Sequence, residues 1–333
     1  MSELLAVREV SKTFGSNNRP AVDKVSFECQ RGEVLAIVGG SGSGKTTLLR
    51  IIAGLEIPDA GEISLDGKRI NGPTDFLPPE KRDCTLVFQD YALFPNMNVE
   101  QNVFFGKTAK QRPEQVKKLL ELTKISALIK RYPHEISGGE QQRVALVRAL
   151  ATNPSLVLLD EPLSHLDPEL RDSVRAELIN LFKETETTAL FVSHDTEDAM
   201  AMADRVIVMR DGRNVQVGTP SEIYSRPKTR YAALLFGKTN LIPLKLIPGA
   251  PHHFHDERSE AQVVSIRPHD WQILQKDSSD TSSAFSGIVK TVHYKGTHLE
   301  VVLESGDRQI TFNAPPKAAI KVGEELAIAP KFD

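Results

Sequence analysis

The sequence predicts an α/β domain built on a mostly parallel core sheet, followed by a small all-β domain. Over residues 1–236, short apolar runs alternate with longer helical patterns, as strands and helices do in α/β domains. Glycine-rich GGSGSGKTT stands between an apolar run and a helical pattern. From residue 261 onward, short alternating runs are broken by Gly and Pro, which favours a small β-barrel or sandwich. We therefore predict two domains, residues 1–236 and 237–333.

Short apolar runs predict the strands of the core sheet, which is buried on both faces. These runs are residues 33–38, 84–88, 156–159, 189–192 and 205–209. Near the N-terminus, residues 4–10 and 21–29 instead alternate apolar and polar side chains, and an Asp66-Gly67 turn follows EISL. This pattern predicts a smaller antiparallel sheet beside the core.

Residues 91–150 are predicted to form a helical insert. Pro113 suits a first helical position, and apolar side chains follow it at helical intervals up to Ile125. A further helical pattern, EQQRVALVRALA, follows Gly138 and Gly139. After Phe236 the chain loses periodicity, so residues 238–260 are predicted to be a linker or an irregular connection.

Composition restricts the class of protein. The chain has 333 residues, 41 basic and 44 acidic side chains and a net charge of -3, which gives no overall attraction to nucleic acid or anionic lipid. Cys29 and Cys84 are too few for a disulfide framework or a cysteine zinc site. Neither an export signal nor an apolar run long enough to span a membrane is found. A soluble, cytoplasmic protein is expected.

The glycine-rich segment matches the pattern G-x-x-x-x-G-K-[ST] in a strand–loop–helix context, which predicts nucleotide binding. Its backbone N–H groups would face the β- and γ-phosphates of ATP, with Lys45 supplying charge and Thr46 a hydroxyl ligand for Mg²⁺. A chance GKT in a glycine-rich turn is the alternative. The predicted ATP-binding residues of this segment are Gly39, Gly40, Ser41, Gly42, Ser43, Gly44, Lys45, Thr46 and Thr47.

Two carboxylates end the apolar run SLVLLDEP. A buried strand presents its last side chains at the carboxyl edge of the sheet, beside the phosphate loop. Asp160 is then predicted to face Mg²⁺, and Glu161 to polarise an attacking water as a general base. On its own, a strand followed by Asp-Glu is more often a solvated strand end.

Further motifs follow in a fixed order. Gln89 lies in VFQDYALFPNM, residues 137–141 read SGGEQ, residues 164–167 read SHLD, and His194 lies in FVSHD after an apolar run. Together with the phosphate loop, these motifs resemble those of the ATP-binding cassette ATPases. That resemblance implies an α/β P-loop ATPase domain with a helical subdomain at about residues 91–150, and ATP and Mg²⁺ as cofactors.

The resemblance also assigns roles. Glu161, His194 and Gln89 are implied to be catalytic, and Thr46, Gln89 and Asp160 to hold Mg²⁺. Phe14 would stack on adenine, with a core residue beside a turn as the alternative, and the alternative for His194 is a structural strand-end histidine. In this family two subunits pack head to tail as a homodimer, so the remaining ATP contacts come from Ser137, Gly138, Gly139, Glu140 and Asp167 of the partner subunit.

Some positions depart from the usual family pattern. The signature begins with Ile136 where Leu is usual and has Glu140 where Gln is usual, the phosphate loop has Gly40 where Pro is common, and His165 replaces a frequent Ala. Ile136 and Gly40 are mild changes. Glu140 adds a negative charge near a phosphate site, although Glu occurs here in importer-type members.

The absence of coiled coils, of a second cassette and of membrane helices excludes the chromosome-maintenance, translation-factor and exporter branches. RYAALLFGKTNLIP, SIRPHD and SGIVKTVHYKG resemble the transport-associated OB-type (TOBE) domain of the maltose, polyamine, ferric-iron and sulfate uptake group. The resemblance implies an ATP-hydrolysing subunit of an importer, working with transmembrane permease subunits and, indirectly, an extracytoplasmic solute-binding protein. It would lie at the cytoplasmic face of the inner membrane and bind no nucleic acid.

The solute is predicted to be ferric iron or a polyamine, with sulfate, another oxyanion or a sugar as further options. Two alternatives stay open: a soluble cassette ATPase acting on nucleic acid or the ribosome, and a ligand-sensing ATP-dependent regulator.

Two segments have ambiguous roles. Residues 91–97 could contact the permease, or cap the core of the helical insert. His252, His253 and His255, with Asp256, invite a transition-metal site, but a solvated linker is the preferred interpretation.

Overall fold

The computed structural model describes residues 2–15, 19–164, 166–274 and 283–332. The chain divides by its packing into two compact units, Met1–Pro220 and Ser221–Asp333. This division lies before the predicted domain boundary at 236/237. The physical reason is that α8 (Pro220–Ser225) and α9 (Arg230–Leu235) pack within the second unit, where Ala233 shares a buried cluster with Phe254 and Val263.

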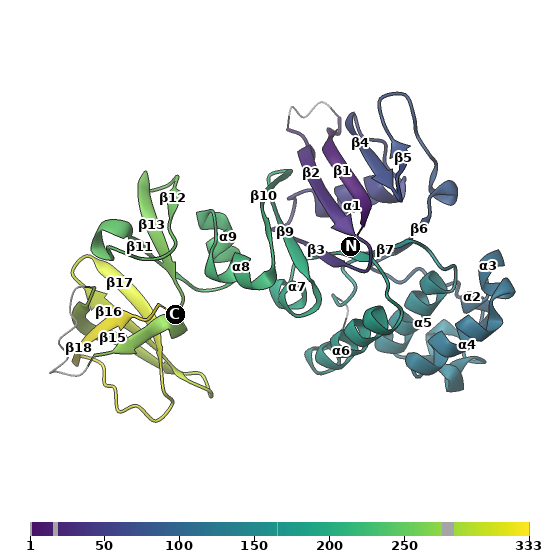
Figure 1. Cartoon of the computed structure of the whole chain (residues 1–333). Coiled ribbons are helices and arrows are strands. Elements are labelled where there is room, and N and C mark those ends of the chain that lie inside the picture. Colours follow the sequence, from purple (N-terminus) through teal and green to yellow (C-terminus); the bar gives the residue numbers. More distant parts are fainter. Residues whose placement is uncertain (1, 16–18, 165, 275–282, 333) are drawn as a thin grey trace. The chain divides into compact units, whose positions relative to one another are not determined.

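The first unit contains a six-stranded sheet in the order β10-β9-β3-β8-β7-β6 (Figure 1). Its strands are β3 (Val34–Val38), β6 (Cys84–Val87), β7 (Leu156–Asp160), β8 (Ala189–Ser193), β9 (Arg205–Arg210) and β10 (Arg213–Gly218). All neighbours run parallel except β9 and β10. The predicted runs therefore form the parallel core, and their carboxyl ends meet at one edge.

A four-stranded antiparallel sheet flanks the core, as predicted, in the order β2-β1-β4-β5. It consists of β1 (Glu3–Lys12), β2 (Val22–Gln30), β4 (Ala60–Leu65) and β5 (Lys68–Asn71). Asp66 and Gly67 both have positive φ in the turn between β4 and β5. Helix α1 (Lys45–Ala53) packs between the two sheets, and its buried Leu and Ile side chains join one apolar cluster with both.

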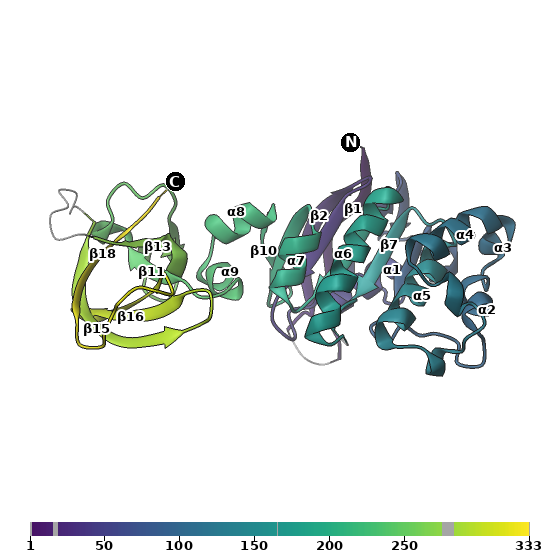
Figure 2. The same ribbon diagram turned by 90° about the horizontal axis from the view of Figure 1, so that it is seen from below.

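Strand alternation directs other side chains, such as Ala36 and Leu159, to the opposite face of the core sheet. Helices α6 (Pro168–Glu184) and α7 (Thr196–Met202) lie on that side (Figure 2). The predicted insert contains the α-helices α2 (Val99–Val103), α3 (Lys107–Gln111), α4 (Pro113–Leu122) and α5 (Gly138–Leu150), joined by turns and two short 3-10 helices. Pro113 is the first residue of α4, as predicted.

The second unit is mostly β-structure. One sheet has the order β11-β13-β12 and the other the order β14-β18-β15-β16-β17. The strands are β11 (Asn240–Pro243), β12 (Phe254–Asp256), β13 (Ala261–Ile266), β14 (Trp271–Ile273), β15 (Phe285–Tyr294), β16 (Leu299–Ser305), β17 (Arg308–Ala314) and β18 (Glu325–Pro330). Residues of both sheets, among them Ile266 and Phe312, share one core.

The prediction of a linker over residues 238–260 is wrong. This segment supplies β11 and β12, which pair with β13 on either side. Both strands are short, and Pro248, Gly249 and Pro251 lie between them, so their periodicity is too brief to recognise in the sequence. Within the described ranges, no helix is long and apolar enough to cross a membrane.

Candidate active site

The phosphate loop occupies residues 39–44, between the end of β3 and the start of α1. Gly44 has φ of 97°, and a Cβ atom there would lie 2.1 Å from the carbonyl oxygen of Ala21. A Cβ at Gly39 would lie 2.2 Å from the carbonyl oxygen of Met209. Only glycine fits this close approach of backbone segments, which explains the glycine spacing of the motif.

Lys45 is the first residue of α1, and its ammonium group lies against the loop. Its Nζ donates hydrogen bonds to the carbonyl oxygens of Gly39 at 2.8 Å and Gly40 at 3.1 Å. Burial lowers the pKa of Lys45, while the charges of Glu161 and Asp160 oppose that shift. The Oγ of Ser43 is buried and, in the described part of the chain, has no hydrogen-bond partner. A cation and a spare hydroxyl in a glycine cradle fit the phosphates of a nucleotide.

Thr46 and Asp160 meet across the site. The Thr46 hydroxyl donates to Asp160 Oδ1 at 3.2 Å. Burial raises the pKa of the Asp160 carboxyl, and the hydrogen bond from Thr46 acts in the opposite direction. A hydroxyl and a carboxylate are oxygen ligands of the type that Mg²⁺ accepts, so these two residues could hold this ion.

Glu161 is the point at which three strand ends converge. Its Oε2 lies 3.0 Å from His194 Nδ1 and 3.4 Å from Gln89 Nε2. Gln89 follows β6, Glu161 follows β7 and His194 follows β8, so parallel neighbours bring the three side chains to one edge of the sheet. Glu161 has a positive φ of 47°, a strained conformation of the kind that occurs at functional sites.

Ser164 belongs to the same cluster, but the sequence analysis gave it no role. Its hydroxyl oxygen accepts a hydrogen bond from Gln89 Nε2 at 3.3 Å and donates to the carbonyl oxygen of Glu161 at 2.9 Å. The signal was its place in the motif SHLD, three residues after the glutamate. Of that motif, His165 lies outside the described residues.

The signature residues stand at the start of α5. Ser137 is the N-cap, and its backbone N–H and hydroxyl donate to Glu140 Oε2 at 2.7 and 2.8 Å. These bonds lower the pKa of the Glu140 carboxyl. Gly138 and Gly139 form the first turn, so α5 presents its N-terminal N–H groups beside a carboxylate.

Phe14 and Asp167 complete the predicted set. Phe14 is 45% exposed, which excludes the interpretation as a core residue, and Lys12 Nζ lies 5.4 Å from its ring centroid. Asp167 is the N-cap residue of α6. None of the hydrogen bonds described for Phe14, Ser137, Glu140 or Asp167 reaches Glu161, so the structure does not bring these residues together with the cluster.

Known proteins resemble both parts of this architecture. Residues 22–164 match the ABC transporter family, and residues 264–333 match the TOBE domain family. The spermidine/putrescine import ATP-binding protein PotA of Trichormus variabilis is 40% identical over 90% of this chain and 83% of its own length. The protein of the same name from Nitrosospira multiformis is 38% identical over 99% of this chain and 97% of its own length.

The chain belongs to the ABC transporter family of ATP-binding cassettes. It is an ATP-hydrolysing transport ATPase with a C-terminal TOBE domain. A cassette from Clostridium perfringens, cbiO1 of the cbiONQ transporter complex, has a TM-score of 0.61 and 30% identity over 67% of this chain and 91% of its own. A dimeric post-hydrolysis cassette bound to ADP and phosphate has a TM-score of 0.56 and 29% identity over 65% of this chain and 99% of its own.

In this cassette, the loop after Gln89 is held by α5. Arg148 donates to the carbonyl oxygens of Tyr91 at 2.9 Å and Ala92 at 2.8 Å, and its guanidinium lies 5.3 Å from the Phe94 ring centroid. Tyr91 is buried, as capping of the insert's core requires, whereas Phe105, whose ring centroid lies 4.4 Å from that of Phe94 with the rings tilted by 38°, is 54% exposed. The burial of Tyr91 supports the capping role for this part of residues 91–97, and contact with a permease stays a prediction.

The histidine cluster does not assemble into a metal site. Over the ranges that the structure describes, no group of three or more His, Cys, Asp or Glu could hold a metal ion. Asp256 is buried in β12 and pairs with Arg230 at 2.9 Å, while His255 between Phe254 and Asp256 points outward to solvent. The pairing of β12 with β13 directs these neighbouring side chains to opposite faces.

Proposed function

We propose that this cassette drives the import of a polyamine. The support comes from relatives named as spermidine/putrescine import proteins, which this chain matches over most of its length and theirs. The observation that carries the ATPase part is the convergence of Gln89, Glu161 and His194 beside the phosphate loop. Ferric iron and sulfate, which the sequence analysis left open as solutes, are tested beside spermidine in the uptake experiment below.

ATP would bind with its phosphates in the loop of residues 39–47. The N-terminal N–H groups of α1 and the charge of Lys45 would face the β- and γ-phosphates, and Ser43 Oγ would donate a hydrogen bond that it does not make to any described residue. Thr46, Asp160 and Gln89 would hold Mg²⁺, which neutralises phosphate charge when bound. Phe14 is exposed, as stacking on an adenine ring requires.

Glu161 would orient the attacking water and withdraw its proton as the γ-phosphate is transferred. His194 and Gln89 both contact Oε2 of Glu161, so they fix the rotamer of the carboxylate. Ser164 in turn holds both the side chain of Gln89 and the backbone of Glu161. The four residues form one hydrogen-bonded unit, and we expect loss of any one to disturb the base.

The second half of each nucleotide site would come from another copy of the chain. The start of α5 offers N–H groups for an anion, but its described hydrogen bonds stay within Ser137 and Glu140. In a head-to-tail homodimer, Ser137 of the partner subunit and the residues that follow it would close on the γ-phosphate. A dimeric arrangement is named for the similar cassette bound to ADP and phosphate.

Permease subunits and a solute-binding protein would complete the importer, with this chain at the cytoplasmic face of the membrane. Arg148 gives a physical link for the coupling, because it lies on the helix that begins at the signature and binds the loop that follows Gln89. Closure of the dimer on ATP would therefore move residues 91–97 together with α5.

Solute uptake tests this proposal. Cells lacking the chain are complemented with wild type or with Glu161→Gln, and uptake of labelled spermidine, ferric iron and sulfate is measured. We expect wild type alone to restore spermidine uptake and to leave the other two unchanged. Restoration of iron or sulfate uptake instead would overturn the polyamine assignment and keep the transport ATPase. Equal spermidine uptake with wild type and Glu161→Gln would show that Glu161 is not the catalytic base.

A further inference from the structure

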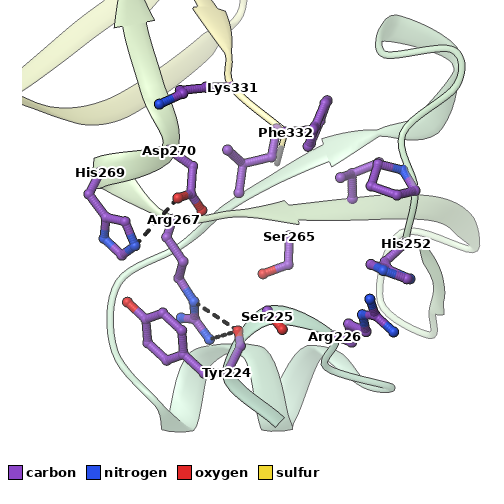
Figure 3. A pocket seen from close by; sticks show the side chains of 13 residues that line it. Tyr224, Ser225, Arg226, His252, Ser265, Arg267, His269, Asp270, Lys331 and Phe332 are labelled. Atoms are coloured by element: carbon purple, nitrogen blue, oxygen red, sulfur yellow. Dashed lines mark hydrogen bonds and ion pairs between the residues drawn. The ribbon is translucent and has the colours of Figure 1, made fainter. Parts of the chain in front are cut away.

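The C-terminal unit contains a cavity of about 350 Å³ to which none of the preceding functions applies (Figure 3). Its walls come from the end of α8, the segment before β12, strand β13 with the turn that follows it, and the residues after β18. This volume lies in the range of sites for small organic molecules. All the lining residues belong to the same unit, so the cavity is a property of that unit alone.

A buried guanidinium forms one wall. Arg267 is only 2% exposed, and it donates to backbone carbonyl oxygens, among them Tyr224 at 3.0 Å and Ala233 at 2.9 Å. Its Cζ lies 4.2 Å from the Tyr224 ring centroid. No carboxylate of the described residues lies within ion-pair distance of Arg267. Carbonyl groups satisfy its donors without neutralising its charge, so a buried positive charge remains beside the cavity.

More positive groups surround the cavity. Arg226 and Lys331 both contribute to the lining, and across the described chain the Lys331 ammonium makes no ion pair. Burial and the nearby charge of Arg226 lower the pKa of His252. The acid of the lining is Asp270, which faces His269 at 3.4 Å (Figure 3). Among the described lining residues, the positive charges therefore outnumber the negative ones, which favours an anion.

The remaining wall is apolar. Val264 and Ile266 are buried in β13, and Phe332, which is 42% exposed, stands with Pro251 in the lining. An inorganic ion would gain nothing from these side chains, whereas a hydrocarbon group would be removed from water there. The lining thus combines cationic groups with a surface that suits carbon atoms.

We propose that this cavity binds a small organic anion, a molecule that carries a carboxylate or phosphate group on a hydrocarbon body. Arg226 and Lys331 lie on opposite sides of the cavity (Figure 3), so the charged group would pair with one of them in the field of Arg267, and the body would lie on Val264, Ile266 and Phe332. The proposal does not depend on the assignment of the ATPase or of its solute.

Calorimetric titration of the full-length chain tests the chemistry of the ligand. Adipate and phenyl phosphate serve as anionic probes. The matched neutral molecules are 1,6-hexanediol, which has the six-carbon chain of adipate, and phenol, which has the ring of phenyl phosphate. We expect saturable binding of an anionic probe below about 10 mM, weakened by salt, and no saturable binding of its neutral match. The anion that binds more tightly identifies the head group. Failure of both anions to bind, or equal binding of a neutral match, would overturn the proposal.

Point variants locate the site. Lys331→Ala or Arg226→Ala should weaken binding of the anionic probe about 10-fold or more, because one of the two removes the charge-assisted contact to the head group. Lys317→Ala removes the same charge from an exposed position outside the cavity and should leave binding unchanged. The emission of Trp271, the single tryptophan, confirms that each variant is folded and should change on ligand binding, since Trp271 follows Asp270 of the lining. Unaltered binding in both Lys331→Ala and Arg226→Ala would refute the assignment.

Discussion

His194 Nδ1 lies 3.0 Å from Glu161 Oε2, although the two residues stand 33 positions apart in the sequence. Strands β7 and β8 are parallel neighbours, and Asp160 is in register with Val192, so their chains leave the sheet side by side. The imidazole therefore contacts the carboxylate from a neighbouring strand end, where it can orient the proposed base.

Replacement of His194 by Ala should lower ATP turnover about 100-fold while ATP affinity stays within a few fold. The reason is that the contact to Glu161 is lost while the phosphate loop is left intact. Phosphate release and equilibrium ATP binding measure the two effects, with His293→Ala in the C-terminal unit as control. Wild-type turnover in His194→Ala would show that the histidine is structural.

Glu140→Gln should strengthen ATP-dependent dimerisation about 5-fold. The amide keeps an acceptor for Ser137 but removes a negative charge from the helix start that is proposed to meet the partner's γ-phosphate. Sedimentation with ATP and Mg²⁺, in a Glu161→Gln background, measures the dimer constant. Glu135→Gln is the matched control, because Glu135 accepts from Tyr132 N–H at 2.7 Å in the same way. A weaker dimer would contradict this account.

Asp160→Asn should raise the unfolding temperature at pH 7 and lower ATP turnover. Burial raises the pKa of the Asp160 carboxyl, so its ionised form destabilises the folded chain above that pKa. As pH falls toward the ordinary Asp value of about 3.9, both states become protonated and the difference disappears. Thermal unfolding between pH 7 and about 4 should show a narrowing gap between the unfolding temperatures of wild type and variant. Exposed Asp307→Asn should show no such gap, and an Asp160→Asn protein less stable at pH 7 would refute the argument.

Arg267→Lys should destabilise the C-terminal unit by about 2 to 4 kcal/mol. One ammonium cannot reach the carbonyl oxygens of Tyr224 and Ala233 together, so buried acceptors lose their donors. Urea unfolding followed by Trp271 emission reports on this unit, and Arg308→Lys serves as the control. A midpoint equal to that of wild type would show that the backbone contacts of Arg267 contribute little.

The core of the site could be predicted from sequence because its chemistry is local. A phosphate loop needs glycines at fixed spacing, and Asp160, Glu161 and His194 follow recognisable buried strands. Parallel pairing then brings the strand ends together without further information. The antiparallel flanking sheet and the helical insert follow in the same way from clear periodicity.

Other features depend on contacts between distant segments. β11 and β12 are too short to show a period, and α8 and α9 are held by contacts with remote segments, among them the hydrogen bonds from Arg267. From the sequence alone, Arg148 cannot be distinguished from an ordinary exposed helix residue. Its contacts with the carbonyl groups of Tyr91 and Ala92 appear only in the structure. Such interactions of a side chain with a remote backbone have no sequence signature.

The assignment of Glu161 as the base is tested most directly by ATP turnover and nucleotide retention in Glu161→Gln. We predict that the rate of phosphate release falls about 100-fold or more in this variant. Intact ATP should be recovered on the purified protein. Glu197→Gln, an exposed acid at the start of α7, should turn over ATP like wild type. Unchanged phosphate release in Glu161→Gln would contradict the central claim, because hydrolysis would then proceed without the residue at which the three strand ends converge.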